Sequence, residues 1–197
     1  LGASIVKVED PVTGDYMRWS PPLVDGMSTV FRALNRGKKS VGINLKDPKG
    51  REAFLGMVDE ADIVLESFRP GVLGRLGLAP ADLLQRKPSL ILVSISGYGQ
   101  RGPRAHKAGH DLNFLARSGL LALNRDASGV PVVPGFQAAD IAGGAWIPLA
   151  QLLAALVQRE RTGEGAWIDT SMADGVRSLA ALPFAELHGS SSAVTDP

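Results

Sequence analysis

The sequence predicts an α/β fold in which helices alternate with the strands of a mostly parallel sheet. Short apolar runs rich in β-branched residues recur along the chain, and segments with apolar residues at three- and four-residue spacing lie between them. Strands that alternate with helices in this way form crossover units, which make neighbouring strands parallel. With 197 residues, the chain is long enough to bury a substantial core.

Five strands and three helices follow from these patterns. The expected strands cover residues 4–9, 40–45, 62–68, 90–96 and 166–172, and the expected helices cover 47–61, 80–88 and 138–165. Asp47 is a candidate N-cap for the first of these helices, and Pro88 ends the second. The third ends in basic residues followed by glycines, as the helix dipole and C-cap preferences favour.

Composition excludes several classes of function. The net charge is +1, from 21 Lys and Arg against 20 Asp and Glu, so no basic surplus points to a nucleic acid. The chain has no cysteine, which excludes disulfides, thiolate metal sites and thiol catalysis, and fits a cytoplasmic setting. No unbroken apolar run approaches the roughly 20 residues of a membrane span, so no membrane partner is expected.

Residues 97–102, "GYGQRG", match the pattern of a dinucleotide-binding turn and follow an expected strand. In that fingerprint the glycines open a helix whose N-terminus holds a pyrophosphate. The next residues, "PRAHKAG", carry no apolar stripe that would pack a helix on the sheet. A glycine-rich turn near a ligand is therefore the better interpretation, and nicotinamide binding is a weaker alternative.

Five basic residues lie in turns around the expected strands: Arg36, Lys38, Lys39, Arg69 and Arg75. Two interpretations explain these residues equally well. They are solvated surface charges, or they form a site for a phosphate-bearing ligand at the carboxyl ends of parallel strands. Spacing alone does not separate these two interpretations.

Asp140 and His110 are the candidate catalytic residues. Asp140 stands at the start of the long helix, where it is either an N-cap or a carboxylate held ionised by the helix dipole. Gly143 and Gly144 follow, and we expect them to leave room for a ligand. His110 is either a polar residue at a helix start or one half of an acid/base pair, and Asp111 beside it is a cap or an orienting partner.

Six motifs carry a resemblance to a known family: "GASIVKVEDPVTGDYMR", "NRGKKSVGINLKDPKGR", "ESFRPGVLGRLGL", "SISGYGQRGP", "AGHDLNF" and "RTGEGAWIDTSMADG". In this order they resemble the class III (family III) CoA-transferases, which include α-methylacyl-CoA racemases. The resemblance implies a large CoA-binding domain with a Rossmann-like core over residues 1–187. Residues 188–197 would be a linker or margin toward a small domain, in an interlocked homodimer. The chain would be a fragment that lacks the N-terminal start and the C-terminal part.

The resemblance also implies a set of CoA-binding residues and no metal or cofactor beyond CoA as the substrate carrier. The residues that match the family's CoA contacts are Ile43, Asn44, Leu45, Lys46, Ser67, Phe68, Arg69, Arg75, Gly109, Asp111 and Phe114. Relatives often carry Arg where this chain has Asp10, so a phosphate contact is either lost or supplied by Lys7 or another basic residue.

Two mechanisms compete within the family. Racemases flank the α-carbon of the thioester with a His and an Asp, and His110 and Asp140 lie 30 positions apart (140−110), as in racemases. We therefore favour a racemase that uses this pair. The alternative is an acyl-CoA:carboxylate CoA-transferase in which Asp140 is the nucleophile, and a non-catalytic CoA-binding domain is a weaker possibility. The acyl group is not specified, beyond an expected apolar lining.

Overall fold

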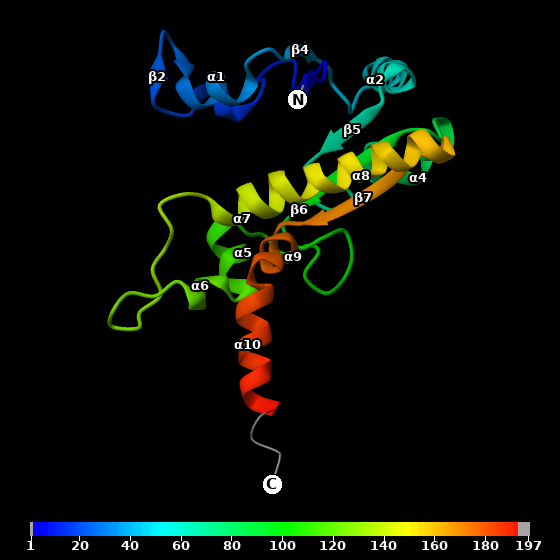
Figure 1. Cartoon of the computed structure of the whole chain (residues 1–197). Helices are drawn as coiled ribbons and strands as arrows, with labels where there is room; N and C mark the ends of the chain where they lie inside the picture. The colour runs from blue at the N-terminus through cyan, green and yellow to red at the C-terminus, as the bar shows by residue number, and fades with distance from the viewer. Residues whose placement is uncertain (1, 193–197) are drawn as a thin grey trace. The chain divides into compact units, whose positions relative to one another are not determined.

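The computed structural model describes residues 2–192, and it alternates strands with helices as the sequence predicts (Figure 1). The chain divides into two compact units, Leu1–Glu60 and Ala61–Pro197, and each is described by itself. Both contain parallel strands flanked by helices, so the predicted α/β class is confirmed.

The first unit is built on two parallel strands. Strand β1 (Val6–Glu9) pairs with β4 (Lys39–Gly42), with Glu9 opposite Gly42. The other elements of this unit are a 3-10 turn at Tyr16–Trp19, the antiparallel strands β2 (Leu23–Val24) and β3 (Met27–Ser28), and helices α1 (Thr29–Asn35) and α2 (Pro48–Glu60). Asp47 Oδ1 accepts the N–H groups of Lys49 and Gly50 at 2.8 and 3.3 Å, so the predicted N-cap is confirmed.

A buried carboxylate joins the segments of the first unit. Glu9 is only 8% exposed, and its oxygens accept hydrogen bonds from Arg18 Nε (2.9 Å) and Nη2 (2.8 Å) and from Ser40 Oγ (2.7 Å). The N–H of Asp15 donates to the same carboxylate at 2.8 Å. The hydrogen bond from Arg18 is the main cause that lowers the pKa of Glu9 to about 2. Glu9 therefore ties β1 to β4 and to the turn that follows β1.

The second unit contains a three-stranded parallel sheet in the order β5-β6-β7. Strand β5 covers Ile63–Glu66, β6 covers Ile91–Ser96 and β7 covers Ala166–Ser171. In the central strand, Ile91, Leu92 and Val93 are all 0% exposed. This explains why β6 is the most continuously apolar of the predicted strands, since a central parallel strand is buried on both faces.

Helices surround this sheet. They are α3 (Val72–Arg75), α4 (Pro80–Arg86), α5 (Asp111–Ser118), α6 (Leu120–Leu123), α7 (Ala138–Ile141), α8 (Ile147–Thr162), α9 (Met172–Arg177) and α10 (Ala181–Ser192), with a π-helical turn at Ala142–Trp146 and a 3-10 turn at Ser178–Ala180. Figure 1 shows α8 lying along β6 and β7. Ala155, Leu152 and Leu156 of α8 pack against Ile91 and Val93 of the sheet.

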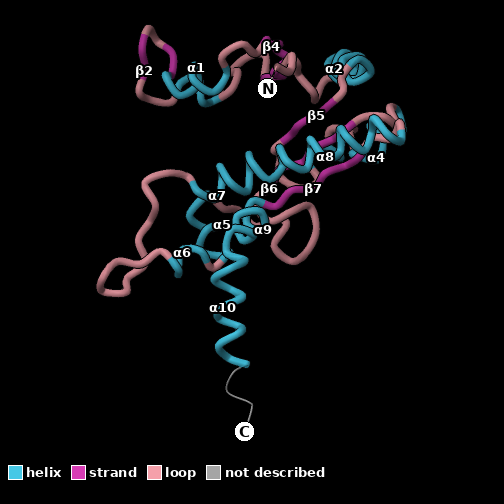
Figure 2. The backbone as a smooth tube through the Cα atoms, viewed as in Figure 1, coloured by secondary structure: helices cyan, strands magenta, loops and turns pink. Residues whose placement is uncertain are grey.

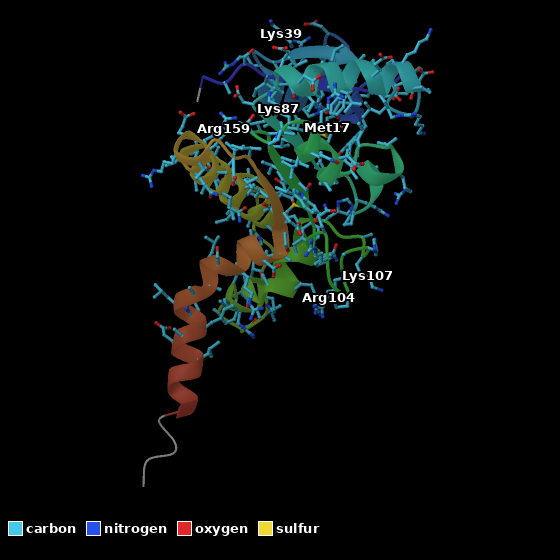
Figure 3. All side chains as sticks on the ribbon, turned by 90° about the vertical axis from the view of Figure 1, so that its right-hand side faces the viewer. Met17, Lys39, Lys87, Arg104, Lys107 and Arg159 are labelled. Atoms are coloured by element: carbon cyan, nitrogen blue, oxygen red, sulfur yellow. The ribbon has the colours of Figure 1, made fainter. Side chains whose placement is uncertain are left out.

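The expected boundaries agree with the observed ones to within about three residues for each strand. The long helix, expected to end at residue 165, ends at Thr162, and Gly163 follows in the left-handed region (φ 76°) as its C-cap. At this end, Arg159 forms an ion pair with Asp62 at 3.2 Å and Lys87 Nζ donates to the carbonyl of Ala61 at 2.8 Å (Figure 3). Arg159 therefore anchors the end of α8 to the start of β5, and Lys87, which follows α4, holds the same segment from another side.

The helix Ala138–Thr162 is long and apolar enough, by length and composition alone, to cross a membrane. Counting unbroken apolar runs in the sequence missed this, although Asp140 is the only charged residue between Ala138 and Val157. One face of this helix packs on the sheet, and 17% of its apolar window is buried.

The chain end was expected to become a linker after residue 187. Helix α10 runs through Ser192 and residues 193–197 lie outside the described residues, so the linker or margin toward a small domain stays a prediction. The single domain over 1–187 likewise stays a prediction, whereas the chain itself separates after Glu60.

The Glu9 cluster generates a stability prediction. Because the pKa of Glu9 is lowered from 4.5 to about 2, its contribution is fully present above pH 4.5 and is lost as the pH falls through about 2. Glu9→Gln should lower the free energy of unfolding at pH 7 by about 2 kcal/mol, because it removes charge-assisted hydrogen bonds from Arg18. Urea denaturation at pH 7 and pH 3 measures both effects.

Glu52 provides the matched control, since it is an exposed carboxylate on α2. Glu52→Gln should change the free energy of unfolding by less than about 0.5 kcal/mol. Equal losses in the two variants would contradict a structural role for the buried carboxylate.

Candidate functional site

The central feature of the site is a carboxylate that caps a helix from outside it. Asp111 Oδ1 accepts the N–H of Ala139 at 2.7 Å and the N–H of Asp140 at 2.9 Å. Helix α7 begins at Ala138 after Gln137, whose side chain makes no capping bond. The expectation that Asp140 is itself the N-cap is therefore wrong. Asp140 lies inside the first turn, and a residue 29 positions earlier in the chain satisfies its backbone.

His110 occupies the N-cap position of α5. Its N–H donates to Asn113 Oδ1 at 3.0 Å, and its carbonyl accepts the N–H groups of Asn113 (2.8 Å) and Phe114 (3.2 Å). Because Asp111 directly follows His110 and contacts the backbone of Asp140, the structure brings the two candidate catalytic residues together. Both residues are exposed. The carboxylate of Asp111 is thus a cap for α7, one of the two roles that the sequence allowed.

The electrostatics of Asp140 reflect this arrangement. Partial burial raises the pKa of Asp140, the negative charge of Asp111 raises it further, and the charge of His110 lowers it. The net shift is upward, so Asp140 keeps its proton to a higher pH than an isolated aspartate. A carboxyl group that takes up and releases a proton nearer to neutral pH is better suited to acid/base work.

The two glycines after Asp140 serve packing, which corrects the expectation that they leave room for a ligand. Gly143 is buried, and a Cβ there would overlap the backbone carbonyl of Met172. At Gly144 it would lie 3.1 Å from Met172 Sδ, and at Gly175 it would lie 2.7 Å from the Cα of Gly143. The π-helical turn at Ala142–Trp146 is therefore held against α9 by close backbone contact. Single π-turns of this kind occur often at functional sites.

An aromatic pair supports the segment that leads to His110. The rings of Tyr98 and Phe114 meet edge to face, with centroids 5.2 Å apart. A Cβ at Gly109 would lie 2.6 Å from Phe114 Cε1 and 3.1 Å from the Tyr98 hydroxyl oxygen, so only glycine fits there. Phe114 is 3% exposed and belongs to the core, so it supports Gly109 from beneath. The sequence analysis did not predict this role for Tyr98. The available signal was its position directly after a glycine at the end of an expected strand.

A second feature is a pocket of about 190 Å³ after β5, which one of the predicted CoA-binding residues lines. Arg69 lines this pocket together with Glu66, Gln100, Arg101 and Trp167, among others. Ser67 and Phe68 are exposed and do not line this pocket. A Cβ at Gly71 would lie 3.3 Å from Arg75 Nη1, so the guanidinium of Arg75 lies over this turn.

A buried hydrogen-bond chain ends in the same pocket, and the sequence analysis missed it. Trp167 Nε1 donates to Ser94 Oγ at 3.0 Å, and Ser94 is in turn hydrogen-bonded to Glu66. Burial raises the pKa of Glu66, and Asp169 contributes a smaller repulsion in the same direction. The signal in the sequence was a glutamate at the carboxyl end of a strand, where ligand sites of parallel sheets lie.

The remaining predicted CoA contacts lie in the first unit. Ile43, Asn44, Leu45 and Lys46 form the turn between β4 and α2, where Asn44 Oδ1 accepts the N–H of Lys46 at 3.0 Å. Asp10 accepts the N–H groups of Val12 and Thr13 in a turn. Lys7 is held by Asp15 at 2.6 Å, so it is not free to take over a phosphate contact as the sequence suggested.

The "GYGQRG" turn does not form a dinucleotide site. No helix follows it directly, since the next helix of the described chain begins at Asp111. The N–H of Gln100, which a phosphate would need, donates to both oxygens of Asp169 at 3.0 and 3.1 Å. The Asp169 carboxylate already accepts this N–H group, so the amide is not available to a pyrophosphate. The nicotinamide alternative therefore has no support.

The fold and the site together define an α/β protein with a histidine and an aspartate at the starts of two helices that are joined through Asp111. The model of "CoA-transferase family III" matches residues 1–195, and the chain belongs to this family.

Named relatives carry CoA-transferase activities in their descriptions. The chain is 41% identical over 173 residues to succinyl-CoA:glutarate CoA-transferase of Mus musculus, covering 87% of this chain and 39% of that protein. It is 44% identical over 176 residues to acetyl-CoA:oxalate CoA-transferase of Acetobacter aceti, covering 89% and 45%. The chain thus spans less than half the length of these relatives.

Solved structures agree with the fold. A CaiB/BaiF family protein from Brucella suis superimposes with a TM-score of 0.86 at 35% identity, over 100% of this chain and 52% of that chain. Rv3272 from Mycobacterium tuberculosis gives 0.84 at 36% identity, over 94% and 52%.

Asp111 can be tested by separating its charge from its hydrogen bonds. Asp111→Asn keeps an acceptor for the N–H groups of Ala139 and Asp140 but removes the charge that raises the pKa of Asp140. The pKa of Asp140 should fall, so its carboxylate should persist to lower pH than in the wild type. NMR titration of the labelled side-chain carboxyl carbons measures this shift.

Asp111→Ala is the companion variant, because it removes the acceptor as well as the charge. It should lower the free energy of unfolding by about 1–2 kcal/mol, the usual cost of a lost helix cap. An unchanged or higher pKa of Asp140 in Asp111→Asn would contradict the electrostatic coupling.

The close contact between the π-turn and α9 also makes a prediction. Gly143→Ala should lower the free energy of unfolding by at least about 2 kcal/mol, because the new methyl group overlaps the backbone of Met172. Gly56→Ala in α2 is the matched control: its Cβ meets nothing within 4 Å and should stabilise the helix by about 0.5–1 kcal/mol. Thermal and urea denaturation of both variants decide the matter, and a neutral Gly143→Ala would refute the packing role.

Proposed function

We propose that the protein acts on acyl-CoA thioesters and inverts the α-carbon by a 1,1-proton transfer between His110 and Asp140. The observation that carries this proposal is the pair of hydrogen bonds from the amides of Ala139 and Asp140 to Asp111. These bonds tie the residue next to the imidazole to the residue that bears the carboxylate. Two acid/base groups are thereby held at neighbouring helix starts. A 1,1-proton transfer requires two such groups, one for each face of the α-carbon.

In the proposed reaction one member of the pair removes the α-proton and the other returns a proton to the opposite face. The carbon–hydrogen bond breaks to give a thioester enolate, so negative charge develops on the carbonyl oxygen. The raised pKa of Asp140 favours this role, because its protonated form is an available acid nearer to neutral pH. Positioned acid/base groups supply about 10²–10⁴-fold, so the enolate oxygen needs donors of its own.

The amides at the start of α5 are the donors that remain for the enolate. The sequence suggested the start of the long helix, but the N–H groups of Ala139 and Asp140 are already donated to Asp111. In α5 the N–H groups of Asn113 and Phe114 bond to the carbonyl of His110. Asp111 and Leu112 supply the other N–H groups of this first turn, and a helix start leaves such amides without intrahelical partners.

The segment before Asp140 fits an apolar acyl group. The loop between α6 and α7 is a long irregular segment, drawn in pink in Figure 2. It exposes the side chains of Val130 (56%), Val132 (43%), Val133 (59%) and Phe136 (62%). Apolar side chains clustered on a loop that ends at the helix of Asp140 favour a branched or long acyl chain over a small charged one.

The second candidate is an acyl-CoA:carboxylate CoA-transferase, which the descriptions of the named relatives favour. In this reaction the carboxylate of Asp140 attacks the thioester carbonyl and the CoA thiolate leaves, which gives a mixed anhydride. The thiolate then attacks the aspartyl carbonyl, and the acyl group leaves as a free carboxylate. The exposure of Asp140 is compatible with this attack. For either reaction we propose CoA as the only carrier and a homodimer as the assembly.

Substitution of His110 distinguishes the two reactions. His110→Ala should abolish incorporation of deuterium from D₂O at the α-carbon of at least one enantiomer of a 2-methylacyl-CoA, a loss of at least about 10²-fold. Asp140→Ala should abolish either activity. Mass spectrometry of the recovered thioester measures the exchange in the intact protein.

Acyl exchange between the CoA thioester and free carboxylic acids is measured in parallel. If this exchange occurs in the wild type and persists in His110→Ala, the protein is a transferase and the racemase proposal is wrong. Hydroxylamine should trap no acyl group on Asp140 in a racemase.

A further inference from the structure

A second pocket of the Ala61–Pro197 unit gathers four guanidinium groups. Its volume is about 170 Å³, smaller than a typical pocket for a drug-sized ligand. The charged side chains that line it are Arg101, Arg104, Arg117, Arg177 and Asp174. Four positive charges against one negative charge leave an excess of three (4−1), whereas the whole chain carries only +1.

The arginines come from three separate elements. Arg101 and Arg104 belong to the loop between β6 and α5, and Figure 3 labels Arg104 on this loop. Arg117 lies in the last turn of α5 and Arg177 in the last turn of α9. A basic residue at a helix end is common because it complements the helix dipole. That preference does not account for the two loop arginines, which converge on the same space.

The charges of this pocket are not neutralised within the described chain. None of the ion pairs found among residues 2–192 involves any of its four arginines. Arg177 stacks on the ring of Phe184, with its guanidinium carbon 5.5 Å from the ring centroid, which leaves its N–H groups available. Like charges held close together repel each other, and a bound anion relieves the repulsion.

The neutral groups of the pocket add a hydrogen-bond donor and a rigid wall. Ser171 Oγ accepts the N–H of Asp174 at 3.1 Å, so its own proton remains free to donate. Tyr98 lines the pocket with a ring that packs on buried Phe114. The lining therefore rests on the core of the unit, and its donors surround a space suited to oxygen acceptors.

We propose that this pocket binds a polyvalent phosphate oxyanion. Guanidinium groups match phosphate oxygens in pairs, and four of them around one small space favour a ligand with at least two negative charges. The proposal stands apart from the reaction at Asp140. The phosphate is either a free anion or part of a larger ligand such as CoA, and Arg101 also lines the pocket that holds Arg69.

Isothermal titration calorimetry of the intact protein with inorganic pyrophosphate, at constant ionic strength in chloride buffer, tests the proposal. The wild type should bind with a Kd below about 1 mM. Arg104→Gln and Arg177→Gln should each weaken binding by at least about tenfold, the usual loss for one charge-assisted hydrogen bond. Lys107→Gln, on the same loop but outside the lining (Figure 3), should change it by less than about threefold.

Asp174→Asn should increase the affinity for pyrophosphate, and a misfolded variant would not show such an increase. Removing the one carboxylate of the pocket should tighten pyrophosphate binding by about threefold or more. Absence of binding in the wild type, or equal weakening by Lys107→Gln and Arg104→Gln, would overturn the proposal. An unchanged affinity in Asp174→Asn would also count against it.

Competition with CoA identifies the source of the phosphate. If CoA displaces pyrophosphate and its own affinity falls in Arg104→Gln, the pocket holds a phosphate of CoA. If both bind together, the pocket takes a free anion. Deuterium exchange at the thioester is measured separately, so failure of the anion site and failure of the proposed reaction remain distinguishable.

Discussion

The hydrogen bonds from the amides of Ala139 and Asp140 to Asp111 are the interaction on which the rest of the site depends. A helix start normally finds its cap within its own sequence, from the residue just before the first turn. Here Gln137 makes no such bond and a carboxylate from α5 replaces it. One side chain thereby joins the start of α5 to the start of α7, and so the backbone of His110 to the backbone of Asp140. Burial is the main cause that raises the pKa of Asp140, and the charge of Asp111 raises it further.

The helices that carry this interaction are held by close packing. Helices α5, α7 and α9 contact one another around a core of Phe114, Leu115, Ala139, Ala173 and Val176. The glycines of the π-turn and of α9 allow backbone to touch backbone, so the helices meet without intervening side chains. Phe114 serves both purposes, since it fills this core and supports Gly109. Rigid packing beneath a site preserves the alignment that acid/base chemistry needs.

Charge is distributed differently in the two units. In Leu1–Glu60 the buried carboxylate of Glu9 is matched by Arg18 and Ser40, so it stabilises local structure and leaves no charge for a ligand. In Ala61–Pro197 the four arginines of the second pocket form no ion pair among the described residues, and Asp174 is the one carboxylate that lines it. Glu66, in the pocket with Arg69, is held partly desolvated by its burial. A charge that is paired within the fold stabilises the structure, whereas an unpaired charge at the surface is available to a ligand.

Local periodicity and capping preferences were enough to predict the α/β class, the five parallel strands, the N-cap Asp47 and the end of the long helix near Gly163. Family motifs added His110 and Asp140 as candidate partners. Three other features are visible only in the folded chain: Asp111 caps α7, Gly143 packs on Met172, and four arginines share one pocket. Each of these depends on residues about 30 or more positions apart in the chain. A hydrogen-bond partner or packing neighbour at that separation depends on how the whole chain folds, and local sequence preferences do not specify it.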